Sequence, residues 1–199
     1  KPGKPLAFGA VQRPDGEDQV ARRGASRLVP RLVRERLPRQ APVAITADGS
    51  YLVTGGLGGL GVEIARWLAA QGARHLVLTS RSGLPPRDEW SVLPAESEVR
   101  RRVTAVQALE TMGVAVEVTA VDVANRPQMT ELFARFGQSL PPLRGIIHAA
   151  VAMTGYPIAA MPPAALTKML APKVQGTWLL HDLSQGMPLD FFVLFSSTT

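Results

Sequence analysis

The chain has 199 residues, of which 46% are hydrophobic and 19% charged, a balance typical of a globular protein with a sizeable core. It has no cysteine, which excludes a disulfide framework and a thiolate metal site, and its three histidines show no ligand spacing. No apolar run approaches the roughly 20 residues that span a bilayer, and the N-terminal region has no apolar signal core. The sequence therefore predicts a cytoplasmic protein with no membrane partner.

The net charge of +6 is concentrated in the first quarter of the chain. Residues 1–49 hold ten Lys or Arg against five Asp or Glu, whereas residues 50–199 hold twelve against eleven. A basic arm can contact nucleic acid or an acidic protein. The arginines alternate with Leu, Val and Pro rather than with aromatic residues, and no nucleic-acid motif is present, so we expect no nucleic-acid partner.

The first quarter predicts little regular structure. Two short apolar and basic runs, 19–22 and 27–33, flank Gly24 and indicate a β-hairpin. A proline-containing connector over 37–50 leads into a more regular region. We expect two domains, 1–46 and 47–199.

From residue 51 onward, strands and helices alternate. The strand segments are apolar along their whole length, which is typical of a parallel sheet with helices on both faces. The sequence therefore predicts an α/β fold with a Rossmann-like, doubly wound parallel sheet, preceded by a short β-rich segment. The expected strands cover 51–55, 75–80, 114–123, 143–150 and 190–197, the expected helices cover 59–70, 98–112, 127–136 and 173–183, and 84–96 is an irregular insertion.

A glycine-rich turn joins the first of these strands to the first helix. Residues 56–61 match G-x-G-x-x-G in the strand–helix context that a dinucleotide site requires. Glycine lets the backbone turn tightly and approach a pyrophosphate, and the helix N-terminus offers its N–H groups to that anion. The alternative is a tight turn without a ligand, although five glycines in seven residues exceed what a turn needs. The predicted cofactor-binding residues here are Thr54, Gly55, Gly56, Leu57, Gly58, Gly59, Leu60 and Gly61.

The end of the second strand predicts which dinucleotide is bound. NAD-binding folds usually place an acid about 20 residues after the glycines, where it holds the ribose 2′-hydroxyl. Here Ser80 and Arg81 occupy that place, and the next acid is Asp88. A guanidinium attracts a 2′-phosphate that a carboxylate would repel, so the sequence predicts NADPH as the cofactor. A solvated surface arginine is the alternative interpretation.

The ends of the third and fourth strands contribute further candidates. Ligands of open α/β sheets bind at the carboxyl ends of the strands. Asp122, followed by Val123, could accept a hydrogen bond from an adenine amino group, or could simply cap the turn before Pro127. The fourth strand ends in His148, Ala149 and Ala150, whose small residues would let the backbone approach the cofactor ribose; His148 itself is more often a core residue than a catalyst.

Six motifs follow one another along the chain, in sequence order TGGLGGLG, TSRSG, VDVAN, GIIHAA, LAPKVQGTWLLHDL and LDFFVLFSS. Together they resemble the ketoreductase domains of modular type I polyketide synthases, within the short-chain dehydrogenase/reductase superfamily. They occur in the family's order over about residues 50–199, and residues 17–38 are similar to the closing strands of the structural subdomain that precedes the catalytic one.

The resemblance implies a reaction and its residues. The family reduces the β-keto group of an acyl chain, tethered to the phosphopantetheine of an acyl carrier protein, to a β-hydroxyl with NADPH. A serine and a tyrosine bind the carbonyl, the tyrosine supplies the proton, and a lysine lowers the pKa of the tyrosine and holds the ribose. Carried over, the lysine is Lys173 and the serine is Ser197. The implied partners are the carrier protein, for which the basic first segment would suit docking, and neighbouring synthase domains.

The sequence departs from the family pattern in two places. The tyrosine is expected about a dozen residues beyond Ser197, past Thr199, so these 199 residues alone are expected not to reduce a ketone. The segment Met153–Gly155 stands where many family members that set one hydroxyl configuration carry Leu-Asp-Asp, which leans towards the opposite configuration without settling it.

Three alternatives stay open at this point. The chain could be a non-catalytic, cofactor-binding or structural reductase fragment. It could belong to a type I fatty-acid synthase, which shares the chemistry. A free-standing reductase or nucleotide-sugar epimerase is disfavoured, because such proteins usually begin close to the first strand.

Overall fold

The computed structural model describes residues 16–17, 19–35 and 43–196. The chain divides into two compact units, Lys1–Ala41 and Pro42–Thr199. Across the described parts, the helices are all too short or too polar to cross a membrane. The expected division into two domains after residue 46 stays a prediction.

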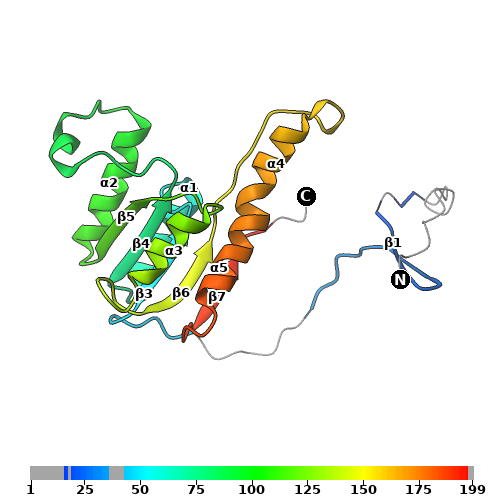
Figure 1. The fold of residues 1–199 in the computed structure, drawn as a ribbon, viewed down its shortest axis with the longest axis horizontal. Coiled ribbons are helices and arrows are strands. Elements are labelled where there is room, and N and C mark those ends of the chain that lie inside the picture. The colour runs from blue at the N-terminus through cyan, green and yellow to red at the C-terminus, as the bar shows by residue number, and fades with distance from the viewer. Residues whose placement is uncertain (1–15, 18, 36–42, 197–199) are drawn as a thin grey trace. The chain divides into compact units, whose positions relative to one another are not determined.

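The first unit contains a small antiparallel hairpin, coloured blue in Figure 1. Its strands are β1 (Ala21–Arg23) and β2 (Ser26–Leu28). Gly24 lies in the turn with a φ of +60°, a conformation that glycine adopts at no steric cost. The hairpin expected around this glycine is confirmed, although its strands are shorter than the runs that predicted it.

The second unit is built on a five-stranded parallel sheet. The strand order is β5-β4-β3-β6-β7, so the first strand of this unit, β3, lies at the centre and the chain winds outward in both directions. This is the doubly wound, Rossmann-like arrangement that the sequence predicts. The strands are β3 (Ser50–Thr54), β4 (His75–Ser80), β5 (Ala115–Ala120), β6 (Leu143–His148) and β7 (Phe191–Leu194).

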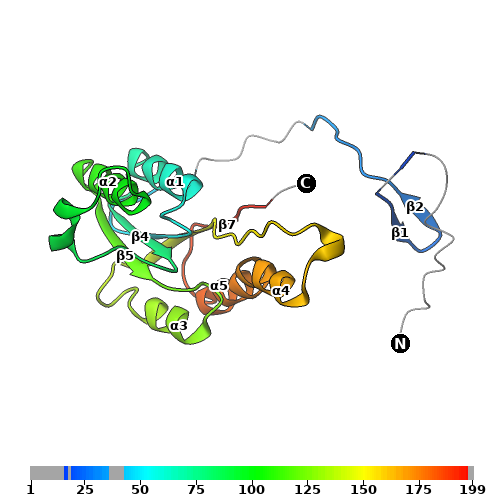
Figure 2. The same cartoon turned by 90° about the horizontal axis from the view of Figure 1, so that it is seen from above.

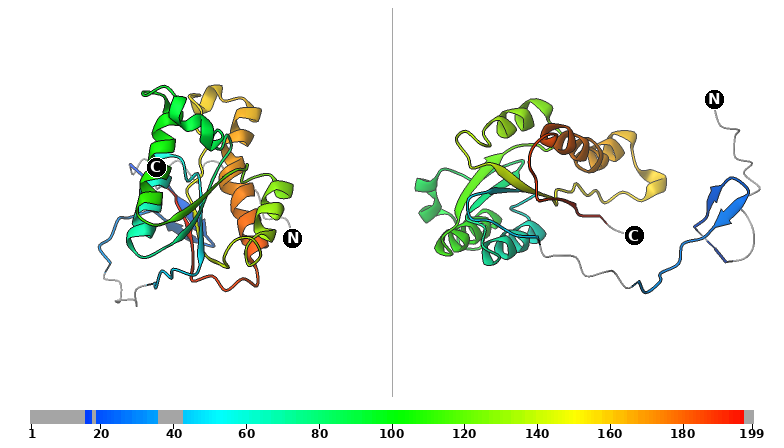
Figure 3. Two further views of the ribbon diagram at one scale, coloured as in Figure 1. Left: turned by 90° about the vertical axis from the view of Figure 1, so that its left-hand side faces the viewer. Right: turned by 90° about the horizontal axis from the view of Figure 1, so that it is seen from below.

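Helices cover both faces of this sheet, as Figures 2 and 3 show. Along β3, Tyr51 and Val53 belong to the core cluster that contains residues of α1 (Gly59–Ala70) and α2 (Glu98–Thr111). Leu52, between them, belongs to the opposite cluster, which contains residues of α3 (Arg126–Ala134) and α5 (Thr177–Ser184). Successive side chains of a strand point to opposite faces, so a wholly apolar strand supplies both cores.

The register of the sheet brings three strand ends level with one another. Thr54, at the end of β3, pairs with Thr79 of β4 on one side and with His148 of β6 on the other. The strands are parallel, so their carboxyl ends all open at one edge of the sheet. The segments that follow these ends are the ones in which the sequence predicts cofactor-binding residues.

One helix differs from its prediction, because it runs straight through a proline. The sequence predicts a helix that begins at Lys173, after Pro172. Instead α4 (Pro163–Ala171) continues through a π-helical turn (Pro172–Gly176) into α5, and Figure 1 shows α4 and α5 in line. Pro172 keeps a helical φ of −63° and ψ of −37°. A proline removes one helical hydrogen bond and crowds the carbonyl four residues earlier, and a π turn is a local way to absorb that defect. We call Pro163–Ser184 the long helix.

Two further differences are smaller. The third strand, expected over 114–123, ends at Ala120, so Asp122 lies in the loop after β5 rather than at the strand end. The insertion expected to be irregular contains one short 3-10 helix, Arg87–Val92. The early end of the third strand reflects the loss of ladder hydrogen bonds, since β4, which pairs with β5, itself ends at Ser80.

Candidate cofactor site

In the glycine turn, the backbone lies very close to other parts of the turn and to β4. Gly55 has a φ of +69°, the N–H of Gly56 donates to the carbonyl of Thr79 at 3.1 Å, and the N–H of Gly58 donates to the carbonyl of Gly55 at 3.0 Å. A Cβ on Gly61 would lie 2.2 Å from the Gly55 carbonyl oxygen, and one on Gly56 would lie 2.8 Å from Cβ of Leu78. These glycines are therefore required by the fold of the turn itself.

Gly59 differs from its neighbours, because a Cβ there would meet no atom within 4 Å. It is the first residue of α1, whose N-terminus has no side-chain cap and no acidic residue in its first turn. The first N–H groups of a helix have no carbonyl to pair with and carry a partial positive charge. The open space beside Gly59 and the uncapped helix end fit a dinucleotide pyrophosphate, which is the group that the sequence pattern predicts.

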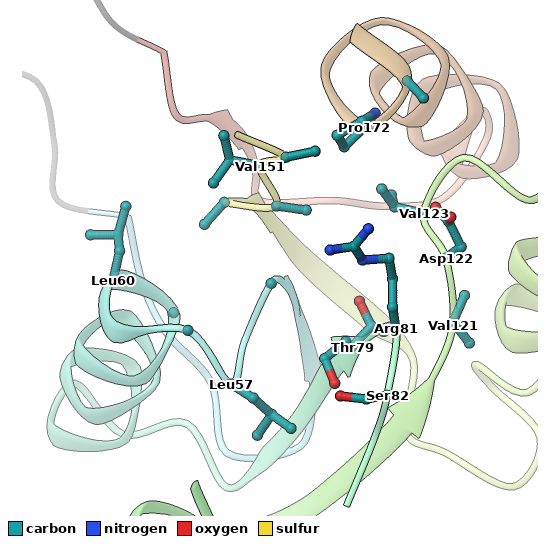
Figure 4. Close-up of a pocket in the computed structure, with 18 of the residues that line it drawn as sticks. Leu57, Leu60, Thr79, Arg81, Ser82, Val121, Asp122, Val123, Val151 and Pro172 are labelled. Carbon is teal, nitrogen blue, oxygen red and sulfur yellow. The ribbon is translucent and has the colours of Figure 1, made fainter. Parts of the chain in front are cut away.

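A cavity of about 740 Å³ lies at the carboxyl edge of the sheet, and Figure 4 shows part of its lining. Its walls come from the glycine turn, the loops after β4, β5 and β6, one residue of α2, and the long helix. Twelve of the predicted site residues line it: Gly55, Leu57, Gly58, Gly59, Leu60, Gly61, Ser80, Arg81, Asp122, Val123, Ala149 and Ala150.

The remaining predicted site residues are not in that lining. Thr54 and His148 are fully buried beneath the cavity, and Gly56 packs against β4. Lys173 lies one residue beyond Pro172, which does line the cavity. Ser197 lies outside the residues that the structure describes, so its placement as the catalytic serine stays a prediction.

Arg81 extends from the end of β4 into the cavity. In Figure 4 its guanidinium lies on the side of Val123 and Asp122. The side chain of Ser80 turns back instead, and its hydroxyl accepts a hydrogen bond from the N–H of Gly83 at 3.0 Å. Ser80 therefore shapes the loop, while Arg81 offers its charge to the cavity.

Asp122 serves the loop as well as the cavity. Its carboxylate accepts the N–H of Ala124 at 2.9 Å, and its own N–H donates to the side-chain oxygen of Gln128 at 2.9 Å. The turn role that the sequence left open is thus present. Asp122 also remains exposed at the cavity wall, so a second hydrogen bond to a ligand is geometrically available.

A chain of buried hydrogen bonds runs beneath the cavity from β6 to the long helix. The imidazole Nε2 of His148 lies 2.9 Å from the carbonyl oxygen of Pro172, and its Nδ1 lies 2.6 Å from the hydroxyl of Thr54. A carbonyl only accepts, so Nε2 carries the proton and Nδ1 accepts from Thr54. The same hydroxyl accepts the N–H of Ala150 at 3.4 Å. His148 is thus a satisfied core residue with both ring nitrogens paired.

Burial and charge keep this histidine neutral. Desolvation, reinforced by the positive charge of Lys173, lowers the pKa of His148 from 6.5 to about 4, although its bond to Pro172 opposes the shift. A neutral ring matches the hydrogen-bond pattern, in which only one ring nitrogen donates. Protonation would put a second donor against the Thr54 hydroxyl and a second cation near Lys173.

Lys173 points its ammonium at the strand end beyond the cavity. Its Nζ donates to the carbonyl oxygen of Phe195 at 2.8 Å, just after β7 and two residues before Ser197 in the sequence. Burial lowers the pKa of Lys173 below its usual value of 10.5. Lys173 lies in the π turn, within the long helix rather than at a helix start, and this position sets the direction of its side chain towards Phe195.

The cavity also contains residues that the sequence pattern missed. Some of them are next to predicted site residues in the loops after the strands, and this adjacency is the signal from which they could have been predicted. Two others, Arg102 of α2 and Lys168 of α4, carry charge and come from helices where no motif marks them. The complete set of missed lining residues is Thr79, Ser82, Arg102, Val121, Val151, Ala152, Lys168, Ala171 and Pro172.

Comparison with known proteins identifies the family. The model of the KR domain matches residues 49–199. The chain is 41% identical over 180 residues to one component of the phenolphthiocerol/phthiocerol polyketide synthase of Mycobacterium tuberculosis, and this match covers 89% of this chain and 10% of that protein. It is 40% identical over 187 residues to a 6-methylsalicylic acid synthase of Arthrobotrys oligospora, a match that covers 90% of this chain and 10% of the relative.

Solved structures agree with this assignment. An A-type ketoreductase from a modular polyketide synthase superposes with a TM-score of 0.72 at 36% identity, covering 92% of this chain and 36% of that one. The ketoreductase from the first module of phoslactomycin biosynthesis in Streptomyces sp. HK803 superposes with a TM-score of 0.73 at 34% identity, covering 92% and 39%. The chain belongs to the KR domain family of polyketide synthases, whose members bind NAD(P), and it spans about 10% of the length of its curated relatives.

The glycine turn generates the first prediction. Gly61→Ala should destabilise the chain, because its methyl group would overlap the Gly55 carbonyl oxygen. A loss of about 1–3 kcal/mol, typical of overpacking, should appear as a lower midpoint in urea unfolding. Gly59→Ala is the matched control, since its methyl group enters open space in the same helix turn. Equal effects of the two changes would contradict this account of the turn.

The second prediction concerns the buried histidine, His148. The unfolded chain takes up the His148 proton near pH 6.5 and the folded chain only near pH 4, so the contribution of this residue to stability is complete above pH 6.5 and falls as the pH drops towards 4. His148→Gln, which does not titrate, should lose less stability than the wild type between pH 7 and pH 5 in urea unfolding. An identical loss in both proteins would show that His148 is not the group responsible.

Proposed function

We propose that this domain binds NADPH and reduces the β-keto group of an acyl chain to a β-hydroxyl, as part of a polyketide synthase module. The observation that carries the proposal is the cavity at the carboxyl edge of the sheet, in which the glycine turn and Arg81 meet. The turn offers uncapped helix N–H groups to a pyrophosphate, and Arg81 offers a guanidinium to a 2′-phosphate.

The chemistry of such a site divides between cofactor and protein. NADPH, when bound, supplies the hydride. Lys173 brings a positive charge, with a pKa lowered by burial, to the carbonyl of Phe195, two residues before the expected serine in the sequence. An ammonium there would lower the pKa of a neighbouring tyrosine hydroxyl, which is the family's proton donor. His148 touches no ligand in this scheme and acts by holding Pro172.

The substrate and partners follow the family. Relatives that match this chain are polyketide synthases, so we propose that the acyl chain is carried by an acyl carrier protein and that neighbouring synthase domains flank this one. The basic hairpin unit suits an acidic carrier protein, although its Arg31 is already paired with Glu17.

The cofactor proposal is tested by binding. The 199-residue chain should bind NADPH more tightly than NADH in a fluorescence titration. Arg81→Ala should weaken NADPH binding about 10- to 100-fold, because charge-assisted hydrogen bonds contribute about 1.5–3 kcal/mol, and should leave NADH binding nearly unchanged. Equal affinities of the wild type for the two cofactors would overturn the preference for NADPH.

The catalytic proposal needs a turnover assay. We would extend the protein to the length of the solved ketoreductases, since the proton-donating tyrosine is expected beyond Thr199, and follow NADPH oxidation with a β-ketoacyl thioester. Lys173→Met should lower kcat by about 100-fold or more, as expected for a lost acid–base contribution. The unextended chain of 199 residues is the negative control, for which no turnover is expected. Absence of turnover in an extended protein that binds NADPH would favour the non-catalytic alternative.

A further inference from the structure

A second arginine, Arg102, lines the same cavity as Arg81 and comes from a different element. Arg102 lies on α2, and its side chain lines the cavity. Its Nη1 is 3.4 Å from the hydroxyl oxygen of Ser82, the residue that follows Arg81. The cavity is therefore lined by two arginines, and the contact with Ser82 links Arg102 to the loop that carries Arg81.

The three consecutive arginines of α2 differ in their surroundings. Arg100 donates to the carbonyl oxygen of Trp90, away from the cavity lining. Arg101 is outside the cavity lining. Arg102 lines the cavity, and its side chain is only 27% exposed. Helical periodicity turns one of the three towards the cavity.

Glu98, one helical turn earlier, engages Arg102 through its carboxylate. The Glu98 side chain is 68% exposed. An exposed ion pair between residues four apart on a helix contributes only a few tenths of a kcal/mol. A ligand phosphate can therefore displace Glu98 from Arg102 at little cost.

We infer that Arg102 is a second 2′-phosphate-binding residue and that Glu98 holds it when the phosphate is absent. The inference rests on the proposed NADPH site and deepens it. A phosphate monoester carries about 1.5–2 negative charges at neutral pH, more than one guanidinium neutralises. Arg81 and Arg102 together match that charge, and each can form two parallel hydrogen bonds.

The two other charged residues that line the cavity, Lys168 and Asp122, are less suited to bind the 2′-phosphate. Lys168 stands on the wall formed by α4, beside Ala171 and Pro172, rather than at the loop after β4. Asp122 repels a phosphate, and its carboxylate is already oriented by the N–H of Ala124. Arg81 and Arg102, the two arginines connected with the loop after β4, thus remain the candidates for binding the 2′-phosphate.

The test compares NADPH with NADH, which differ only in the 2′-phosphate. Arg102→Ala should weaken NADPH binding about tenfold in a fluorescence titration, with NADH binding unchanged. Arg101→Ala is the matched control, with the same loss of charge one position away, and should bind both cofactors as the wild type does. Glu98→Gln should tighten NADPH binding a few-fold and leave NADH binding unchanged, because Arg102 is released.

Four outcomes would overturn the inference. One is an equal effect of Arg102→Ala and Arg101→Ala on NADPH binding, which would indicate a general charge effect. Another is an equal weakening of both cofactors by Arg102→Ala. If Arg81→Ala abolishes the preference for NADPH while Arg102→Ala leaves it intact, Arg102 has no such role but the proposed function stands. A wild type that does not distinguish NADPH from NADH overturns both.

Discussion

The site depends on a buried hydrogen-bond chain that joins three separate parts of the protein. Thr54 ends the central strand, His148 ends its neighbour, and Pro172 lies in the long helix. Both ring nitrogens of the imidazole are paired, in a place where an unpaired group would cost about 1–3 kcal/mol. The spacing between the glycine turn, the loop after β6 and the long helix is therefore set by specific bonds beneath the cavity, and not by apolar contact alone.

Pro172 couples this network to the catalytic candidate. A proline inside a helix leaves the backbone with an irregular hydrogen-bond pattern, and here the chain passes through a π turn. The carbonyl of Pro172 accepts from His148, and the next residue, Lys173, directs its ammonium to Phe195. The π turn thus directs the carbonyl of Pro172 towards the core and the ammonium of Lys173 towards the residue just after β7.

The positive charge of the cavity comes from side chains that the fold brings together from different elements. The second unit is neutral in sequence, with twelve basic and twelve acidic residues over 42–199. Yet three of the four charged side chains that line the described cavity are basic: Arg81, Arg102 and Lys168. A locally positive cavity in a neutral unit favours an anionic ligand, in keeping with a phosphate-bearing cofactor.

Local sequence was enough to predict what depends on neighbouring residues. Five apolar strands, a helix over 59–70 and the glycine turn follow from short-range patterns, and the structure contains each of them. The glycines are required by contacts within the turn, such as that between Gly61 and Gly55. Arg81 was predictable because its distance from the glycines along the chain is set by one helix and one strand.

Only the tertiary structure decided the rest, because those features depend on residues distant in sequence. A proline locally disfavours a helix, so the sequence predicted a helix start at Lys173, whereas in the structure the helix continues through Pro172, whose carbonyl is bonded to His148 of β6. Arg102 carries no motif and reaches the cavity only because α2 packs beside the loop after β4. The protonation of His148 likewise depends on burial among Thr54, Pro172 and Lys173, which no local pattern contains.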